Sequence, residues 1–402
     1  MLKRVISFPL LLLYGLGTTV GAGIYALMGP VAGHAGSAAP FAFLVASLLA
    51  GLTAVSFAAL SARFPRSAGE AVYFREAFGH RAGASVIGLA VALSGCVSAA
   101  TISRAFAGYL TGVVDLPVGL CVVSGVGVLT ATALWGIRES LWVAALVTVI
   151  EVAGLLLVMW AARDSLAELP MRAGELLPTA AGASWPGIFA GGLLAFYAFL
   201  GFEDMVNVAE EVKDVGRTLP WAIVVTLLLT TSIYVLVAAV SVLTVPPEVL
   251  RESEEPLALV YRTATGTDSA LLSGVAILAM MNGAMIQIVM ASRVLYGLAG
   301  EPFVPRAIGH VHSRFRTPDR ATLLVGGLIL ALALYFPIEP LAAAASSITL
   351  VVFSAVNASL AWLLFRDPTM RASTRIPIGV PLLGLLSNLA FLGYSAWVRL
   401  VP

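Results

Sequence analysis

Charged residues are scarce in this chain: they make up 11% of its 402 residues, against about 25% in a typical soluble domain. Hydrophobic residues make up 59%. So little charge excludes an ordinary water-soluble fold, and we predict an all-α, multi-pass membrane protein surrounded by a lipid bilayer. The formal net charge is +1 and no long basic or acidic tail is present, so nucleic acid is not expected as a partner.

Cysteine and histidine are scarce as well. The two cysteines, Cys96 and Cys121, both lie in apolar stretches, which indicates neither a disulfide framework nor a metal site. The four histidines lie in predicted loops without the spacing of metal ligands on a helix: His34, His80, His310 and His312. We therefore expect no metal, no cofactor and no enzyme active site.

Long apolar runs dominate the sequence, and a helix needs about 20 such residues to cross a bilayer. Charged and proline-rich breaks divide these runs into eleven predicted membrane helices, at residues 8–30, 37–61, 83–112, 117–135, 141–161, 186–208, 219–244, 269–298, 321–337, 340–365 and 378–399. With a cytoplasmic N-terminus, sixteen Lys and Arg residues fall in inner segments and five in outer ones. We therefore expect a plasma-membrane protein whose C-terminus lies outside.

Two segments of similar length each hold five of these helices. Residues 1–162 contain helices 1 to 5, and residues 186–366 contain helices 6 to 10. An outer connection, residues 163–185, joins them, and residues 367–402 add the eleventh helix. Because five is odd, the second set must begin on the opposite side of the membrane. The two sets are therefore predicted to be inverted repeats, as in many secondary transporters.

Glycines crowd the first membrane helix in the stretch GLGTTVGAGIYALMG, residues 15–29. Each glycine weakens a helix by about 1 kcal/mol relative to alanine, so their density predicts a break. In helix 6, the first helix of the second set, the stretch FYAFLGFEDMVN at residues 196–207 predicts another. The amides that begin a half-helix attract a carboxylate, and the carbonyl oxygens that end one accept hydrogen bonds from an ammonium group.

The two breaks together would hold an amino acid zwitterion through the protein backbone. The candidate amides belong to Gly21, Ala22 and Gly23. The candidate carbonyl groups lie near Thr19, Tyr197 and Leu200.

Two other interpretations of the helix 1 glycines are open. Gly17 and Gly21 fit the small-xxx-small pattern of close helix packing. The same stretch also resembles a dinucleotide-binding turn, which needs an acidic residue about 20 positions later. Between Arg4 and Arg63 there is no charged residue, so a dinucleotide site is not expected.

Three acidic residues lie at predicted membrane depth: Glu151 in helix 5, and Glu203 and Asp204 in helix 6. An ionisable side chain there costs about 2.5 to 3.5 kcal/mol and usually faces a pathway or a partner. Burial favours a neutral carboxyl group, which can exchange a proton when water reaches it. Alternatively, each of the three is a neutral carboxyl group that donates a structural hydrogen bond to a neighbouring helix. For Asp204, which lies nearest the cytoplasm, simple solvation is a further alternative.

Four stretches resemble signatures of the amino acid-polyamine-organocation superfamily. GTTVGAGIY at 17–25 resembles its helix 1, and FYAFLGFEDMVNVAEEVKDVGRTLPWAI at 196–223 resembles helix 6 and the following loop, close to the cationic amino acid transporter branch. SARFPRSAGEAVYFREAFG at 61–79 and SRVLYGLAGEPFVP at 292–305 are similar to two inner-loop signatures. The resemblance covers nearly the whole chain.

The resemblance implies a LeuT-like fold of two inverted five-helix repeats with discontinuous helices 1 and 6. Helices 1, 2, 6 and 7 would rock against helices 3, 4, 8 and 9. By motif position, Tyr197 corresponds to an aromatic gate, with Phe199 and Phe202 as its neighbours, and Glu203 to a position that is often acidic. Phe199 and Gly201 are also predicted to be substrate-binding residues. The substrate backbone would be held by Thr19, Gly21, Ala22 and Gly23 on one side and by Tyr197 and Leu200 on the other.

The chain departs from the family pattern in two places. Relatives usually have twelve membrane helices rather than eleven, and we expect this to affect oligomerisation rather than transport. The stretch GIRESLWVAALVTVIE, residues 136–151, resembles a helix 5 block that in several sodium-independent relatives ends in lysine. Here that position is Glu151, a carboxylate that would bind a proton or attract sodium.

These features predict a secondary transporter of amino acids that works by alternating access and is coupled to protons through Glu151 or Glu203, with Na⁺ as the alternative ion. A non-transporting amino acid sensor and an amino acid/polyamine exchanger of the same fold are the alternative functions. The substrate side chain is expected to meet residues of helices 3, 6, 8 and 10, with Ser94, Ser98, Asn282 and Ser347 as candidates. Which amino acid is carried, and the oligomeric state, stay open.

Overall fold

The structure, a computed structural model, describes residues 4, 6–65, 69–135, 141–178, 184–374 and 376–400. Four of the sixteen basic residues predicted on the inner side lie outside these residues: Lys3, Arg66, Arg138 and Arg375. In chain order the helices are α1 (Phe8–Val20), α2 (Ala22–Ala35), η1 (Gly36–Ala38), α3 (Ala39–Arg63), α4 (Gly69–Phe78), α5 (Arg81–Thr111), α6 (Val118–Trp135), α7 (Leu141–Ala161), α8 (Arg163–Arg172), η2 (Ala173–Leu176), α9 (Trp185–Phe199), η3 (Phe202–Glu211), α10 (Val215–Thr244), α11 (Pro247–Glu252), α12 (Pro256–Thr265), α13 (Ala270–Gly297), η4 (Arg306–Gly309), α14 (Asp319–Tyr335), α15 (Ile338–Arg366), α16 (Pro368–Thr374) and α17 (Gly379–Leu400).

The predicted all-α membrane fold is confirmed. Within the described residues, eight segments are long and apolar enough to cross a membrane, and the first of these, Phe8–Arg63, contains α1, α2 and α3. A shorter apolar helix covers Ala145–Ala161. The observed helix ends lie within a few residues of most predicted ends, as for the predicted span 83–112 and α5. The protein is therefore a multi-pass membrane protein, while the count of eleven crossings stays a prediction.

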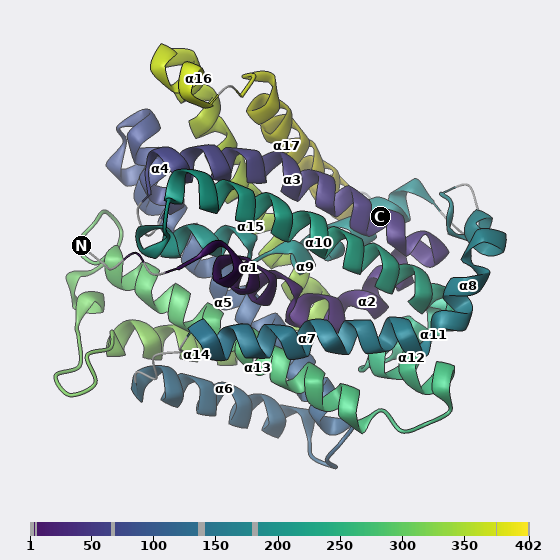
Figure 1. The fold of residues 1–402 in the computed structure, drawn as a ribbon. Helices are drawn as coiled ribbons and strands as arrows, with labels where there is room; N and C mark the ends of the chain where they lie inside the picture. The colour runs from purple at the N-terminus through teal and green to yellow at the C-terminus, as the bar shows by residue number, and fades with distance from the viewer. Residues whose placement is uncertain are drawn as a thin grey trace.

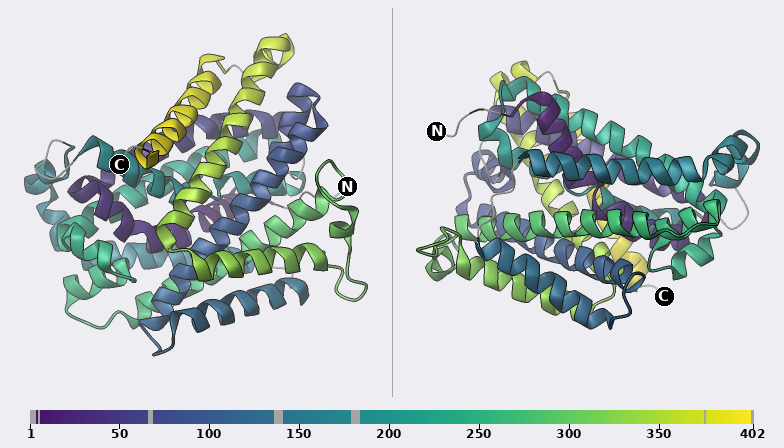
Figure 2. Two further views of the ribbon diagram at one scale, coloured as in Figure 1. Left: turned by 180° about the vertical axis from the view of Figure 1, so that it is seen from behind. Right: turned by 60° about the horizontal axis from the view of Figure 1, so that its bottom comes forward.

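The long helices lie side by side and run from one end of the molecule to the other (Figure 1). The start of α1, the short helices α4 and α16, and the connection between α13 and α14 lie at one end, on the left of Figure 1. Helices α8, α11 and α12 lie at the opposite end, and the rotated views agree (Figure 2). Segments predicted to share the inner side of the membrane thus gather at a single end of the bundle.

Helices at corresponding positions in the two predicted sets pack against each other. Helix α3 packs along α10, α5 along α13, α6 along α14, and α2 along α9. Between these pairs lies an aromatic cluster of Phe57, Phe202 and Phe353, whose ring centroids are 5.3 to 5.8 Å apart in edge-on arrangements. This cluster joins α3, η3 and α15.

The residues before α1 pair with the end of η3. The Ile6 amide donates to the Glu211 carbonyl oxygen at 3.0 Å, and the Lys213 amide donates to the Ile6 carbonyl oxygen at 2.9 Å. This isolated parallel bridge is the only strand-like pairing among the described residues. It ties the beginning of the first membrane helix to the end of the sixth.

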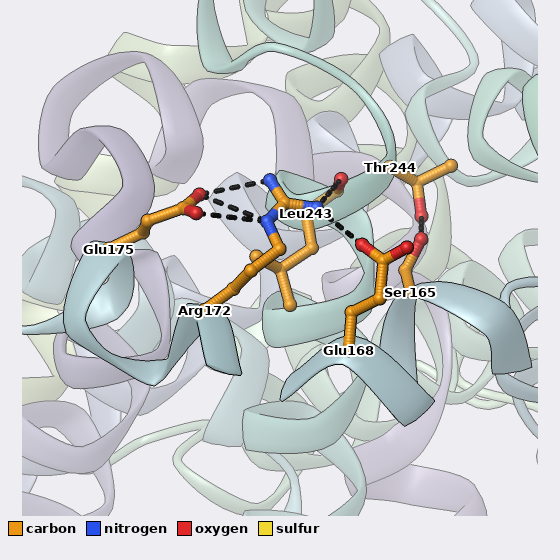
Figure 3. A network of polar contacts seen from close by, with 6 residues as sticks. All are labelled: Ser165, Glu168, Arg172, Glu175, Leu243 and Thr244. Atoms are coloured by element: carbon orange, nitrogen blue, oxygen red, sulfur yellow. Dashed lines mark hydrogen bonds and ion pairs between the residues drawn. The ribbon is translucent and has the colours of Figure 1, made fainter. Parts of the chain in front are cut away.

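Arg172 anchors the connection between α7 and α9 to the end of α10 (Figure 3). Its guanidinium donates to the Leu243 carbonyl oxygen at 3.1 Å and to Glu175 at 2.9 Å, and Ser165 contacts Thr244 at 2.9 Å. Glu175 is an exposed partner, so the ion pair adds little stability on its own. The contact to the backbone of Leu243 fixes the connection against the end of α10.

A buried polar cluster joins α17 to the rest of the bundle. The Asn357 amide nitrogen on α15 donates to Thr53 on α3 at 2.8 Å, and Ser56 donates to the Asn357 side-chain oxygen at 2.6 Å. Asn388 on α17 donates to the same Thr53 hydroxyl at 3.3 Å. Polar side chains at membrane depth therefore fix α17 against α3 and α15.

Candidate functional site

The first break lies between α1 and α2. Helix α1 ends at Val20 and α2 begins at Ala22, and Gly21 between them has a ψ of −131°, far from the helical value. No described side chain caps the start of α2. Its first amides therefore have neither an intrahelical acceptor nor a side-chain acceptor. The predicted discontinuity of helix 1 is confirmed.

The second break lies just after α9. Leu200 is extended, with a ψ of 137°, and Gly201 has a φ of +122°, a conformation in which any side chain is strained. The Gly201 amide donates to Oε2 of Glu203 at 2.8 Å. The chain continues as the 3₁₀ helix η3 rather than as an α-helix. The predicted discontinuity of helix 6 is confirmed as well.

The backbones of the two breaks touch. Oγ1 of Thr18 lies 2.9 Å from the Gly201 carbonyl oxygen, and a Cβ atom placed on Gly201 would lie 2.1 Å from the Thr18 carbonyl oxygen. A Cβ atom on Gly23 would lie 2.6 Å from Cα of Ala198. Close packing, which the sequence left open for Gly17 and Gly21, therefore explains why Gly23 and Gly201 have no side chain. It is compatible with a ligand beside them, because their main-chain groups remain polar.

Tyr234 on α10 joins the two breaks. Its buried hydroxyl lies 2.7 Å from the Thr19 carbonyl oxygen and 2.9 Å from the Ala198 carbonyl oxygen, and can donate its proton to either. The ring packs edge-on against Phe199, with 5.1 Å between centroids. The carbonyl groups at the ends of α1 and α9 are thereby held around one phenol oxygen.

We expect Tyr234→Phe to lower the free energy of unfolding by about 1 to 3 kcal/mol, because the two buried carbonyl oxygens lose the hydroxyl donor that they share. The midpoint of thermal unfolding in detergent measures this change. Tyr335→Phe is the matched control, since Tyr335 is 82% exposed on α14. If both variants have the same midpoint of thermal unfolding as the parent protein, the Tyr234 hydroxyl does not hold the breaks together.

A buried cavity, called the central cavity below, lies between the breaks. Six of the predicted substrate-binding residues line it: Thr19, Gly21, Ala22, Gly23, Tyr197 and Leu200. The other two, Phe199 and Gly201, adjoin the break but are not among its lining residues. Its other walls come from Thr18, Ala198, Ser98, Ile102, Gly283, Ile286 and Gln287. No charged side chain is among the described residues that line it, so its polar character comes from the backbone, hydroxyls and one amide.

Tyr197 closes one side of the central cavity. Its hydroxyl donates to the Ser98 carbonyl oxygen at 2.9 Å and lies 3.0 Å from the Ser98 hydroxyl. Of the predicted side-chain contacts, Ser98 therefore lies at the cavity. Ser347 donates to the Ala343 carbonyl oxygen of its own helix and does not line the cavity.

Glu151 lies beside the first break. It is fully buried on α7, and its Oε2 lies 3.9 Å from where a Cβ atom on Gly21 would be. Asn282 donates to Oε1 at 3.4 Å, and Tyr25 donates to the Glu151 backbone carbonyl at 2.9 Å. Oε2 has no hydrogen-bond partner among the described residues. A carboxyl oxygen without a partner in an apolar interior is costly, which marks this position as more than a packing residue.

A second cavity, called the acidic cavity below, adjoins the central cavity and shares Ser98, Leu200 and Gln287 with it. Three acidic side chains line it: Glu70, Glu203 and Asp204. Asp204 is only 5% exposed, so of the interpretations left open, the one in which it is simply solvated was wrong. Burial raises the pKa of Glu70, on the short helix α4, to about 7.

The sequence did not single out Tyr234, Glu70 or Gln287 as site residues. A tyrosine in the middle of a membrane helix was an available signal for Tyr234, because tyrosines favour the membrane interfaces. Gln287 is the only glutamine of the chain and lies in the apolar run MIQIVM. Its amide nitrogen lies 3.4 Å from Asp204, and it lines both cavities.

A family model described as amino acid permease matches residues 6–399. The cationic amino acid transporter 3, mitochondrial, of Arabidopsis thaliana is 30% identical over 383 residues, which cover 89% of this chain and 62% of the plant protein. An uncharacterized transporter of Mycobacterium tuberculosis is 32% identical over 363 residues, which cover 89% of this chain and 80% of the relative. The branched-chain amino acid permease BcaP of Bacillus subtilis is 27% identical over 425 residues, which cover 100% of this chain and 90% of the relative.

This chain thus spans about three fifths of the plant relative's length and most of the two bacterial ones. The family model extends from the residues just before α1 almost to the end of α17. Both helix breaks and both cavities lie inside the matched range. The protein therefore belongs to the amino acid permease family, as the resemblance of its helix 1 and helix 6 stretches predicted.

Proposed function

We propose that this protein is a secondary transporter that carries amino acids across the plasma membrane by alternating access. The observation that supports this best is the meeting of two helix breaks at a buried cavity whose walls carry main-chain groups and no charged side chain. Such a lining suits a small zwitterion, which brings both of its charges with it. The cavity measures about 20 Å³, room for about one water molecule, so the helices around it must move apart before a substrate enters. The names of two relatives, an Arabidopsis cationic amino acid transporter and a Bacillus branched-chain amino acid permease, agree on amino acids and differ on the side chain.

The two ends of the zwitterion would bind at different breaks. The amides at the start of α2, from Gly21 to Gly23, are suited to the carboxylate because they add the positive end of a helix dipole. Thr19 and Tyr197 offer carbonyl oxygens to the ammonium group. These oxygens already accept hydrogen bonds, from Tyr234 and from the Leu200 amide, but a carbonyl oxygen has two lone pairs. The substrate side chain would then meet Ser98 and Gln287.

Alternating access requires two groups of helices that move as units. Helices α3 and α10, and α2 and α9, pack closely within one proposed moving group. Helices α5, α6, α13 and α14 pack among themselves as the other group. Each group contains helices from both proposed repeats, which are residues 1–162 and 186–366, with 163–185 as the connection and 367–402 added. The acidic cavity contacts both groups and lies toward α4, the predicted cytoplasmic side, so we propose it as the inner part of the route.

The coupling ion in this proposal is a proton carried by Glu151. A buried carboxyl with one oxygen unpartnered favours its neutral form and can ionise when water enters. Sodium would require several oxygen ligands around the same carboxylate. Glu203 is the second candidate, although its Oε2 already accepts from the Gly201 amide. The N-terminus is proposed to be cytoplasmic and the C-terminus to lie outside.

Reconstitution tests the proposal directly. The purified protein is first screened by thermal shift against the proteinogenic amino acids, with and without sodium and at two pH values. Ligands that stabilise it are then supplied with a radioactive label to proteoliposomes, with protein-free liposomes as the control. We expect accumulation driven by an inward proton gradient.

Other outcomes identify the alternatives. Stabilisation without any flux would indicate an amino acid sensor. Uptake that requires unlabelled amino acid or polyamine inside the liposomes would indicate an exchanger. If no amino acid stabilises the protein or crosses the membrane, the proposed function is refuted.

A further inference from the structure

The connection between α13 and α14 carries an unusual excess of positive charge. It runs over residues 298–318 at the end of the bundle that also holds α4 and α16, in light green at the left of Figure 1. Including the first turn of α14, it contains four exposed arginines: Arg306, Arg314, Arg316 and Arg320. We propose that this connection, called the basic loop below, binds the headgroups of anionic phospholipids in the adjoining leaflet.

The acidic residues of the basic loop already have partners other than the four arginines' side chains. Glu301 accepts a two-pronged contact from Arg81, at 2.9 and 3.0 Å, and Asp319 lies 2.7 Å from His310. None of the ion pairs formed among the described residues includes one of the four arginines. Four guanidinium groups are therefore presented to the surroundings without neutralising carboxylates.

The basic loop is held in a fixed shape. The His312 amide donates to the Thr317 carbonyl oxygen at 2.9 Å, and the Thr317 hydroxyl donates to the Leu134 carbonyl oxygen of α6 at 2.7 Å. Arg316 is held in the left-handed region, with a φ of 59°. The loop therefore presents its arginines without a large further ordering cost on binding.

An exposed aromatic ring lies in the same loop. Phe303 is 70% exposed and has a φ of 72°, a strained conformation for an aromatic residue. The Gly300 amide, which donates to the Val304 carbonyl oxygen at 3.1 Å, closes the turn around it. An apolar ring presented beside arginines suits the boundary between headgroups and acyl chains.

The partner follows from position and charge. The basic loop joins two membrane helices that end at Gly297 and begin at Asp319, so lipid headgroups are its immediate neighbours. A guanidinium group binds phosphate oxygens in a two-pronged manner, and each arginine near an anionic surface strengthens binding by about fivefold. A phosphodiester headgroup with a net negative charge therefore fits the loop better than a zwitterionic one.

The test uses the full chain in detergent and a short-chain phosphatidylglycerol as the probe, with thermal stabilisation as the readout. We expect dioctanoyl phosphatidylglycerol to raise the melting temperature, and dioctanoyl phosphatidylcholine to have little effect. In the variant R306Q/R314Q/R316Q/R320Q, the apparent Kd for phosphatidylglycerol should rise by at least about tenfold. The variant R4Q/R63Q/R75Q/R366Q loses the same charge at the same end of the bundle and should keep the parent Kd within about threefold.

Three results would overturn the proposal. In the first, both quadruple variants lose affinity equally, which would show a diffuse charge effect. In the second, the basic loop variant keeps the parent affinity. In the third, inorganic phosphate stabilises the protein as well as the lipid does. If the quadruple variant does not fold, R314Q/R316Q and Phe303→Ala are measured in its place. Both should weaken the lipid effect, and unchanged Kd values in these two variants would likewise refute the site.

Discussion

Gly201→Ala is expected to lower amino acid uptake by about a hundredfold. A methyl group at this position would lie 2.1 Å from the Thr18 carbonyl oxygen, and the φ of +122° disfavours any residue with a Cβ atom. Neither backbone can yield without moving a half-helix. A misfit of about 3 kcal/mol in the conformation that holds the substrate corresponds to the expected loss of rate. Initial rates of uptake into proteoliposomes measure it.

Matched glycine substitutions separate this contact from a general effect of alanine. Gly274→Ala on α13 and Gly216→Ala on α10 place the new methyl group in open space, and both should retain parent uptake. Gly23→Ala disturbs a second contact between the two breaks, because its methyl group would lie 2.6 Å from Cα of Ala198. Folding is checked by gel filtration and thermal unfolding. Parent-like uptake by both Gly201→Ala and Gly23→Ala would show that the breaks need not touch during transport.

The positions of the two breaks were predictable because their cause is local. Glycine weakens a helix wherever it lies, so the stretch at residues 15–29 and the single Gly201 after an aromatic run were sufficient signals. The ends of the membrane helices were predictable for a similar reason, since apolar length is a property of a short segment. The 3₁₀ conformation of η3 was not predictable, because it depends on how the chain leaves the turn at Gly201.

The partners across the bundle were not predictable. Tyr234 contacts Thr19 and Ala198 only because α10 packs against both breaks. A single sequence does not show which helices pack together. Asp204 looked solvated by its distance along the chain, yet the fold buries it beside Gln287. Residues that act through tertiary contacts therefore have to be read from the structure, even where the fold itself follows from the sequence.

Glu151→Gln is expected to abolish accumulation against a gradient while substrate binding remains. The parent protein, with one proton carried per amino acid, can accumulate substrate by about tenfold per unit of pH difference. Glutamine has the size of glutamate and keeps an oxygen for Asn282, whose amide lies 3.4 Å from Oε1, but it cannot take up or release the proton. The accumulation ratio should fall to about one, and uptake should no longer rise as the outer pH falls.

Glu203→Gln provides the comparison that assigns the coupling group. Glu203 already has a backbone partner in the Gly201 amide, whereas Oε2 of Glu151 has none among the described residues and lies beside the first break. If Glu151 carries the proton, uptake by Glu203→Gln depends on pH as in the parent protein. Glu151→Gln then still equilibrates substrate across the membrane, and substrate raises its melting temperature as much as it raises that of the parent protein. Proton-driven accumulation by Glu151→Gln together with its loss in Glu203→Gln would move coupling to the second break. A carboxyl group that lies beside the first break, rather than in the substrate cavity, can sense the opening of that break, which is why we place coupling at Glu151.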